Sequence, residues 1–248
     1  MTYGICELSL VPLREAGQHS SPLISEILYG ELFQILSHQK KWSRIRLLDS
    51  CEGWIENSQF KEISKEAYSD LKKSNTKVLI DLVEFVYQDK NILFPISIGS
   101  IVQHSSFLVH HFEGNSSLGI VEKSKIRETA FMFLNTPYRQ GGKSPFGIDA
   151  SGFVQLVYRL CGILLPRTSK EQSEKGETLS FIEESEVGDL AFFDDNEGNI
   201  IHVGIVLENN HIIHAHGQVR IDRLDQTGIY NADIRKHTHK LRLIKAIS

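Results

Sequence analysis

The stretch GGKSPFGIDASGFVQLVYRLCG, residues 141–162, decides how the C-terminal half of the chain folds. Asp149 in this stretch is a residue type that caps helices, because its carboxylate accepts backbone N–H groups of the first turn. The residues after it place one apolar stripe at helical spacing: Phe153, Val154, Val157 and Leu160. Gly162 follows the stripe and is typical of a helix C-terminus. We therefore predict an amphipathic helix that begins directly after Asp149.

The first position of this predicted helix suits a reactive side chain, but Ala150 occupies it. The helix dipole favours negative charge in the first turn, so a cysteine here would have a lowered thiol pKa. The backbone N–H of residue 150 could also bind an oxyanion. Cys161 cannot replace the missing thiol, because it lies further along the same helix, about 16 Å away at ~1.5 Å per residue. Taken alone, an Asp-Ala-Ser-Gly sequence predicts only a capped helix start.

Composition and charge exclude several classes of function. The 248 residues, with 41% hydrophobic and 23% charged side chains, are ordinary for a soluble globular protein of one or two domains. A net charge of −4 gives no basic surplus to neutralise phosphates, so nucleic acid is not an expected partner. No apolar run is long enough to span a bilayer, and the N-terminus lacks the pattern of a signal peptide. We therefore expect a cytoplasmic protein without membrane insertion, and a monomer.

Three scattered cysteines, Cys6, Cys51 and Cys161, have neither metal-ligand spacing nor the pattern of a disulfide framework. This favours a reducing compartment. We expect neither a metal nor an organic cofactor.

The N-terminal part predicts small all-β domains. Residues 1–62 contain short alternating runs separated by turn residues, which is typical of a small barrel. The order Tyr29-Gly30-Glu31, then Trp42, then Gly53-Trp54 resembles bacterial SH3-like domains, and we expect Trp42 to lie in the core. Residues 61–76 are charged and predict a linker. Residues 76–116 are again rich in strand signals and predict a second, divergent SH3-like domain.

The pattern changes at about residue 117, where a third domain is expected to extend to residue 248. Residues 121–135 carry one stripe at helical spacing, made of Ile126, Ala130, Phe131 and Leu134. The helix after Asp149 comes next, and strands are predicted at 188–195, 200–208, 211–217 and 239–247. Two helices followed by an antiparallel sheet indicate an α+β domain.

Several motifs in this third domain occur in order and at suitable separations: PYRQGGKSPFGIDASGF, LPRTSKEQ, VGDLAFFDD and IHVGIVLENNHIIHAH. Together they resemble the NlpC-type family of bacterial cell-wall cysteine peptidases, over roughly residues 118–248. The resemblance implies a papain-like fold and places the nucleophilic cysteine at Ala150. It also implies that His202 is the catalytic base and that His214 orients it.

The hairpin between the two histidines must have the right length for this pair to form. Side chains alternate across a strand, so a two-residue turn at Asn209-Asn210 would put His202 and His214 on opposite faces, whereas a three-residue loop would put them on one face. His216 has the same parity as His214, and only the resemblance favours His214. A zinc site of His202, His214 and His216 is the alternative, although no fourth ligand has suggestive spacing.

Relatives with N-terminal SH3-like domains resemble γ-D-glutamyl-L-diamino acid endopeptidases, which cut murein peptides that have a free N-terminal L-Ala. The resemblance implies that the substrate, L-Ala-γ-D-Glu-L-diamino acid, is bound by residues of several segments: Tyr138, Asp149, Ser151, Thr168, Ser169 and, from the first SH3-like domain, Glu31. Thr168 departs from the pattern, because relatives commonly have an aspartate before this serine. The loss of that carboxylate weakens the case for tight binding of an amine.

Three hypotheses follow. The first is a murein-peptide endopeptidase in which a Cys-to-Ala change at residue 150 has removed activity, since the other motif elements are present. The second is a natural pseudoenzyme that binds murein peptides without cutting them, which the departure at Thr168 also supports. The third is a related hydrolase or amidase that acts on other amides.

Overall fold

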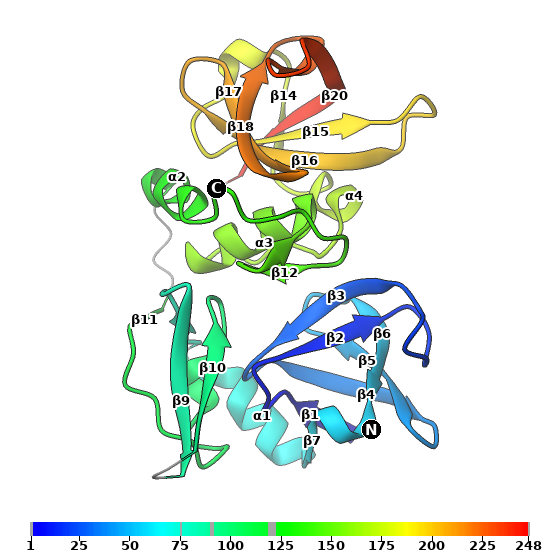
Figure 1. Ribbon diagram of the computed structural model, residues 1–248, viewed down its shortest axis with the longest axis vertical. Helices are drawn as coiled ribbons and strands as arrows, with labels where there is room; N and C mark the ends of the chain where they lie inside the picture. The colour runs from blue at the N-terminus through cyan, green and yellow to red at the C-terminus, as the bar shows by residue number, and fades with distance from the viewer. Residues whose placement is uncertain (1, 75, 90–91, 119–122, 248) are drawn as a thin grey trace. The chain divides into compact units, whose positions relative to one another are not determined.

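The computed structural model describes residues 2–74, 76–89, 92–118 and 123–247. The chain divides into two compact units (Figure 1). The first contains Met1–Ile120 and Gln140–Pro145, and the second contains Val121–Arg139 and Phe146–Ser248. In the part of the chain that the structure describes, no helix has the length and apolar character needed to cross a membrane.

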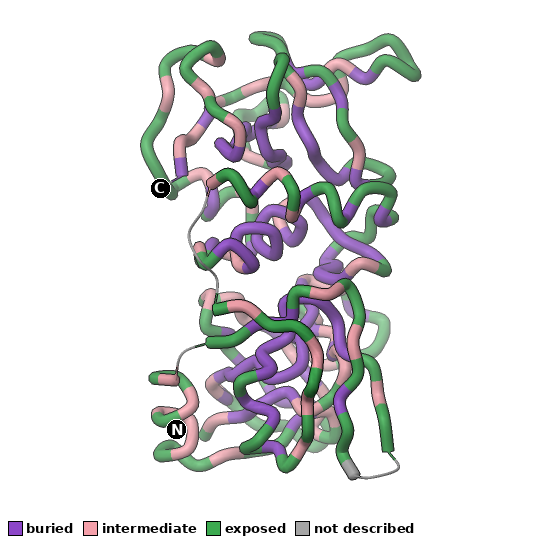
Figure 2. Tube along the Cα trace, turned by 90° about the vertical axis from the view of Figure 1, so that its left-hand side faces the viewer, coloured by how far each residue is buried: buried purple, intermediate pink, exposed green. Residues whose placement is uncertain are grey.

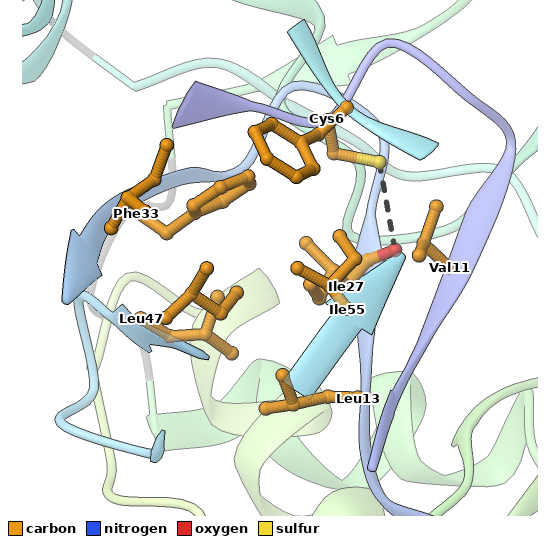
Figure 3. Packing of buried hydrophobic residues seen from close by; sticks show 10 residues of the cluster. Cys6, Val11, Leu13, Ile27, Phe33, Leu47 and Ile55 are labelled. Carbon is orange, nitrogen blue, oxygen red and sulfur yellow. Dashed lines mark hydrogen bonds between the residues drawn. The ribbon is translucent and has the colours of Figure 1, made fainter. Parts of the chain in front are cut away.

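The first unit is built on an antiparallel sheet of seven strands in the order β3-β2-β6-β5-β4-β1-β7. These strands are β1 (Thr2–Ile5), β2 (Leu10–Arg14), β3 (Leu23–Leu28), β4 (Leu32–His38), β5 (Trp42–Leu47), β6 (Glu52–Glu56) and β7 (Lys61–Ile63). Alternating apolar side chains from several strands meet in one core, in which Cys6, Phe33 and Ile55 are buried (Figure 3). Trp42 is buried, as expected, and Trp54 is only partly buried.

The prediction of a linker at residues 61–76 is wrong over most of its length. Lys61–Ile63 forms β7, and Lys65–Lys73 forms the helix α1, which Ser64 caps by accepting the N–H of Ala67. Tyr68 and Leu71 lie three residues apart on one helix face and pack against buried residues. Two anchoring side chains are therefore sufficient to hold a helix whose sequence is otherwise charged.

Residues 76–116 form short two-stranded pairings rather than a large sheet. The strands are β8 (Val78–Leu79), β9 (Val83–Asp89), β10 (Ile92–Ser97) and β11 (Ser116–Ser117), and they pair as β9 with β10 and β8 with β11. Leu79, Val86 and Ile96 of this segment share one apolar cluster with Ile5 and Tyr29. The segment thus adds to a core that the N-terminal strands also line, and a separate second SH3-like barrel stays a prediction.

Among its described residues, the second unit contains three α-helices: α2 (Lys123–Phe131), α3 (Ala150–Leu160) and α4 (Ser169–Gln172). All four residues of the stripe predicted for α3 are buried, and Gly162 has a φ of 82°. The N–H of Ile163 donates to the carbonyl of Tyr158, which is the Schellman arrangement at a helix end. The predicted glycine stop is therefore confirmed.

The prediction for residues 121–135 is only partly right. Ile126 and Ala130 are buried in α2, but the helix ends at Phe131, and Phe131 and Leu134 are 40% and 37% exposed. Asn135 has a φ of 66°, a conformation that an α-helix cannot contain. Residues 121 and 122 of the predicted helix lie outside the described residues.

The sheet of the second unit follows the helices, as predicted, and closes on itself. Its strands are β14 (Glu177–Leu179), β15 (Leu190–Asp194), β16 (Ile200–Leu207), β17 (His211–His216), β18 (Gln218–Leu224), β19 (Gly228–Asn231) and β20 (Lys236–Ala246). The order is β14-β20-β15-β16-β17-β18-β19, and β19 also pairs with β20. This last pairing closes the six strands β15 through β20 into a ring. Strands β14, β18 and β19 were not predicted from the sequence.

One face of this ring is apolar along most of its length, with Phe193, Val206 and Ile212 among its buried residues. The helix α3 packs against β16 and β17, and burial is concentrated in this helix and in the strands β15, β16 and β17. Figure 2 shows the buried parts of the trace in purple. The second unit is thus an α+β structure, dominated by strands, in which the helix that begins at Ala150 lies against the hairpin that carries both predicted histidines.

Candidate active site

Ala150 is the first residue of α3, directly after the cap. The Asp149 carboxylate accepts the N–H of Gly152 at 2.7 Å, and this fixes where the helix begins. Ala150 is 6% exposed. Cys161 lies at the other end of the helix, is buried and contacts Thr129. Burial raises the pKa of the Cys161 thiol, so this cysteine lies at the wrong end of the helix and in the wrong environment to serve as a nucleophile.

Asp149 forms a buried ion pair as well as the cap. Arg167 donates to both carboxylate oxygens, at 2.9 Å and 2.7 Å, and also to the Ser151 hydroxyl at 2.9 Å. Arg167 and Asp149 are 3% and 5% exposed. Two residues predicted to bind substrate therefore share a guanidinium that the sequence analysis did not identify. Arg167 lies within the motif LPRTSKEQ, and no role was predicted for it.

His202 on β16 and His214 on β17 form a direct hydrogen bond. Leu207 pairs with His211, so the hairpin has a three-residue loop, the length that places the two histidines on one face. Asn209 and Asn210 in this loop have φ values of 56° and 57°, a conformation that asparagine tolerates better than most residues. Nε2 of His202 lies 2.9 Å from Nδ1 of His214, with the rings nearly perpendicular.

Burial keeps both imidazoles neutral over the physiological pH range. His202 is 6% exposed, and His214 is fully buried. Burial, aided by the neighbouring histidines His239, His214 and His216, lowers the pKa of His202 well below its ordinary value. Burial also lowers the pKa of His214, although the Asp222 carboxylate opposes this shift. A neutral His202 can accept a proton, which is the property a general base needs.

The hydrogen-bond chain continues from His214 to Asp222 on β18. Nε2 of His214 lies 3.1 Å from the Asp222 carboxylate, which also accepts from Arg220 at 2.8 Å and 2.9 Å. Asp222 is 5% exposed. Asp222 and Arg220 were not predicted as site residues, because β18 was not predicted as a strand. The alternation of apolar and polar residues in QVRIDRL is the signal that could have revealed it.

His239 on β20 is the remaining neighbour of the histidine pair. Its ring stacks on His202 with centroids 4.0 Å apart, and it lies edge-on to His216 at 4.9 Å. Burial, with the nearby histidines, lowers the pKa of His239 to about 3. His239 falls within a predicted strand, but the closure of the sheet that brings it to β16 has no signal in the sequence.

Ring nitrogens of His202, His214 and His239 all lie within 4.8 Å of one another. Among the described residues, these three histidines are the group that could hold a metal ion. This set differs from the zinc alternative of the sequence analysis, since His239 replaces His216. Both ring nitrogens of His214, however, already take part in hydrogen bonds, one with His202 and one with Asp222. The donors therefore fit a proton-transfer pair better than a metal site.

The remaining predicted residues of this unit lie in two segments. Tyr138 is 41% exposed, and partial burial, together with the nearby Asp149 carboxylate, raises the pKa of its hydroxyl. Thr168 caps α4, and its hydroxyl donates to Glu171 at 2.7 Å. Ser169 is the first residue of that helix and is partly buried. Their binding roles stay predictions.

Glu31 belongs to the first unit. Its carboxylate accepts the N–H of Leu28 at 2.8 Å and lies 3.2 Å from the ammonium of Lys143, which is 2% exposed. A buried cation therefore already balances the charge of Glu31 within its own unit. Its predicted contact with substrate stays a prediction.

Comparisons with known proteins agree with the organisation of the chain. Residues 135–238 match the NlpC/P60 family, and residues 13–60 match the bacterial dipeptidyl-peptidase Sh3 domain. The "Probable endopeptidase NlpC homolog" of Haemophilus influenzae is 35% identical to the chain over 134 residues, which cover 48% of this chain and 70% of that protein. The chain belongs to the NlpC/P60 family. It is therefore a member of a family of cysteine hydrolases, with Ala150 where the resemblance places the nucleophile.

Other similar proteins match different shares of the chain. The dipeptidyl-peptidase 6 of Lysinibacillus sphaericus is 26% identical over 250 residues, covering 86% of this chain and 88% of that protein. A γ-D-glutamyl-L-lysine dipeptidyl-peptidase of Bacillus cereus is 39% identical over 89 residues, which cover 35% of this chain and only 26% of that protein. An NlpC/P60 family protein from Bacillus cereus has a similar fold, with a TM-score of 0.77 at 17% identity, and the match covers 98% of this chain and 99% of the other.

Proposed function

We propose that the chain has the architecture of a γ-D-glutamyl-L-diamino acid endopeptidase for murein peptides, and that Ala150 leaves it able to bind but not to cut. The observation that carries this proposal is the hydrogen bond between His202 and His214, on the hairpin against which α3 packs. A helix start that would favour a thiolate and a neutral imidazole pair are two of the components that thiol-dependent acyl transfer requires.

With a cysteine at residue 150, the reaction proceeds in two stages. His202 takes the proton of the thiol, the resulting thiolate attacks the carbonyl of the γ-D-Glu residue, and the backbone N–H of residue 150 helps to hold the oxyanion. His202 protonates the leaving amine of the diamino acid, which gives a thioester. His202 then removes a proton from water, and the water hydrolyses the thioester.

The substrate class is proposed from the relatives. Proteins named γ-D-glutamyl-L-lysine dipeptidyl-peptidase and dipeptidyl-peptidase 6 are among those similar to the chain. We propose that Tyr138, Asp149, Ser151 and Ser169 contact the peptide, with L-Ala at its free N-terminus. Thr168 offers a hydroxyl rather than a carboxylate, so its contribution to binding an ammonium group is expected to be weaker.

The decisive experiment restores the thiol. Ala150→Cys, incubated with L-Ala-γ-D-Glu-L-diamino acid tripeptides that end in lysine or diaminopimelate, is expected to release the diamino acid, while the unaltered chain releases none. Mass spectrometry of the products measures this. The matched control is Ala150→Cys with His202→Gln, which should lower the rate on the order of 10²- to 10⁴-fold, because general base catalysis is lost. A folded Ala150→Cys chain that releases no diamino acid from either peptide would contradict the proposal.

A peptide-binding pseudoenzyme is the second candidate, and two observations favour it. Both the nucleophile position and the position before Ser169 depart from the family pattern, as Ala150 and Thr168. This function requires that the unaltered chain binds the tripeptide in isothermal titration calorimetry, and that Ala150→Cys binds it without hydrolysis. A cysteine codon at position 150 of the native gene would exclude it.

A further inference from the structure

We infer that Asp222 is a positioning residue that fixes the ring tautomers of His214 and, through His214, of His202. The inference deepens the proposed function, because it rests on His202 acting as the base. The geometry that carries it is a continuous chain of hydrogen bonds across three adjacent strands. This chain runs from Nε2 of His202 to Nδ1 of His214 at 2.9 Å, and from Nε2 of His214 to Asp222 at 3.1 Å.

The ionisation state of Asp222 sets the direction of this chain. Arg220 donates to both carboxylate oxygens, and in turn donates to Asp233 at 2.7 Å. Burial acts to raise the pKa of Asp222, but the hydrogen bonds from His214 and Arg220 outweigh burial and lower it. Asp222 is therefore a carboxylate at neutral pH, and a carboxylate can only accept hydrogen bonds.

Each hydrogen bond of this chain can then have only one donor and one acceptor. Because Asp222 accepts, Nε2 of His214 must carry the proton, and Nδ1 of the same neutral ring must be an acceptor. Nε2 of His202 must therefore donate to it, which leaves the lone pair of His202 on Nδ1. That atom is the one available to take a proton from a nucleophile.

The opposite tautomers would disable the base. If His214 carried its proton on Nδ1, it would donate to Nε2 of His202, and the proton of His202 would lie on Nδ1. His202 could then not accept a proton at Nδ1. A neutral polar neighbour in place of Asp222 allows both orientations, whereas a carboxylate allows one. The carboxylate of Asp222, which can only accept, is therefore the feature that gives the pair a single orientation.

The first test uses the unaltered chain, labelled with ¹⁵N, near neutral pH. Long-range ¹H–¹⁵N correlation spectra of the imidazoles are expected to show His202 and His214 both protonated at Nε2 and unprotonated at Nδ1. Protonation of either ring at Nδ1 in the folded chain would overturn the inference. This measurement needs neither a variant nor enzymatic activity.

The second test removes the carboxylate. Asp222→Leu, confirmed as folded by circular dichroism, is expected to give His214 a mixture of tautomers, while Asp233→Asn, which removes a charge one link further out, is expected to leave the spectra unchanged. In the Ala150→Cys background, Asp222→Leu should lower kcat on the order of 10²-fold with little change in KM. An unchanged single tautomer in folded Asp222→Leu would overturn the inference. An inactive Ala150→Cys chain with the expected tautomers would contradict the proposed function alone.

Discussion

At the scale of single residues, the ion pair between Asp149 and Arg167 shows how a helix cap and a candidate site depend on one another. Asp149 caps α3 through Gly152, and Arg167 holds the same carboxylate in place. Both charges are almost completely buried, so each is stable only because the other is present. The position of residue 150 at the helix start therefore depends on a residue 17 positions further along the chain.

Replacing Arg167 is expected to be costly for this reason. Arg167→Met leaves the buried Asp149 carboxylate without its cation and should lower the free energy of unfolding by about 3 kcal/mol. Urea denaturation followed by circular dichroism measures the change. The control is Arg127→Met, since Arg127 pairs with Glu208 on the surface at 2.7 Å and should cost no more than about 1 kcal/mol. Equal costs for the two variants would contradict the buried-pair argument.

At the scale of elements, the β16–β17 hairpin decides whether the histidine pair exists. Its three-residue loop fixes the register in which Gly204 lies opposite His214. A Cβ on Gly204 would lie 2.7 Å from Cδ1 of Ile212 and 2.9 Å from Cβ of His214. The strand therefore has room for His214 in its present place only because residue 204 has no side chain.

Gly204→Ala tests this packing. The added methyl group should displace His214 and lower the free energy of unfolding by about 1–3 kcal/mol, the usual cost of overpacking. Adding Ile212→Val, which removes the Cδ1 atom that the new methyl meets, should recover part of this loss in a double-mutant cycle measured by urea denaturation. Purely additive costs would show that the two side chains do not compete for space.

At the scale of the whole molecule, the buried histidines make stability depend on pH. Burial, together with neighbouring histidines or Arg220, lowers the pKa of His202, His214 and His239 in the folded chain, whereas unfolding returns each to an ordinary value of about 6.5. Below that pH the unfolded chain binds more protons than the folded chain. The free energy of unfolding must therefore fall as pH falls from about 6.5.

The expected slope is up to about 1.4 kcal/mol per pH unit for each such histidine. Urea denaturation at several pH values between 6.5 and 4.5 measures it, and His239→Gln should make the slope shallower because one proton-linked group is gone. A slope that does not change in His239→Gln would contradict the lowered pKa of that residue.

Predictions from local sequence patterns are confirmed where the residues of a single helix or strand decide the structure. The cap at Asp149, the buried stripe of α3 and the stop at Gly162 follow from residue spacing within eleven helical residues. The charged segment that forms α1 was misread, because only Tyr68 and Leu71 anchor it to a core that other strands provide. The strands predicted within residues 76–116 are present, but the way this segment packs depends on partners elsewhere in the unit.

The sequence by itself determined the helix that begins at Ala150, the stop of that helix at Gly162 and the absence of a thiol at the helix start. Those properties depend on neighbours within one helix. Only the tertiary structure decided that the hairpin loop has three residues and that Asp222 and His239 join the pair. Asp222 lies on β18, which pairs directly with β17, and His239 lies on β20, which closes the ring with β19. Strand pairing between distant segments depends on the burial of the whole face rather than on any local pattern.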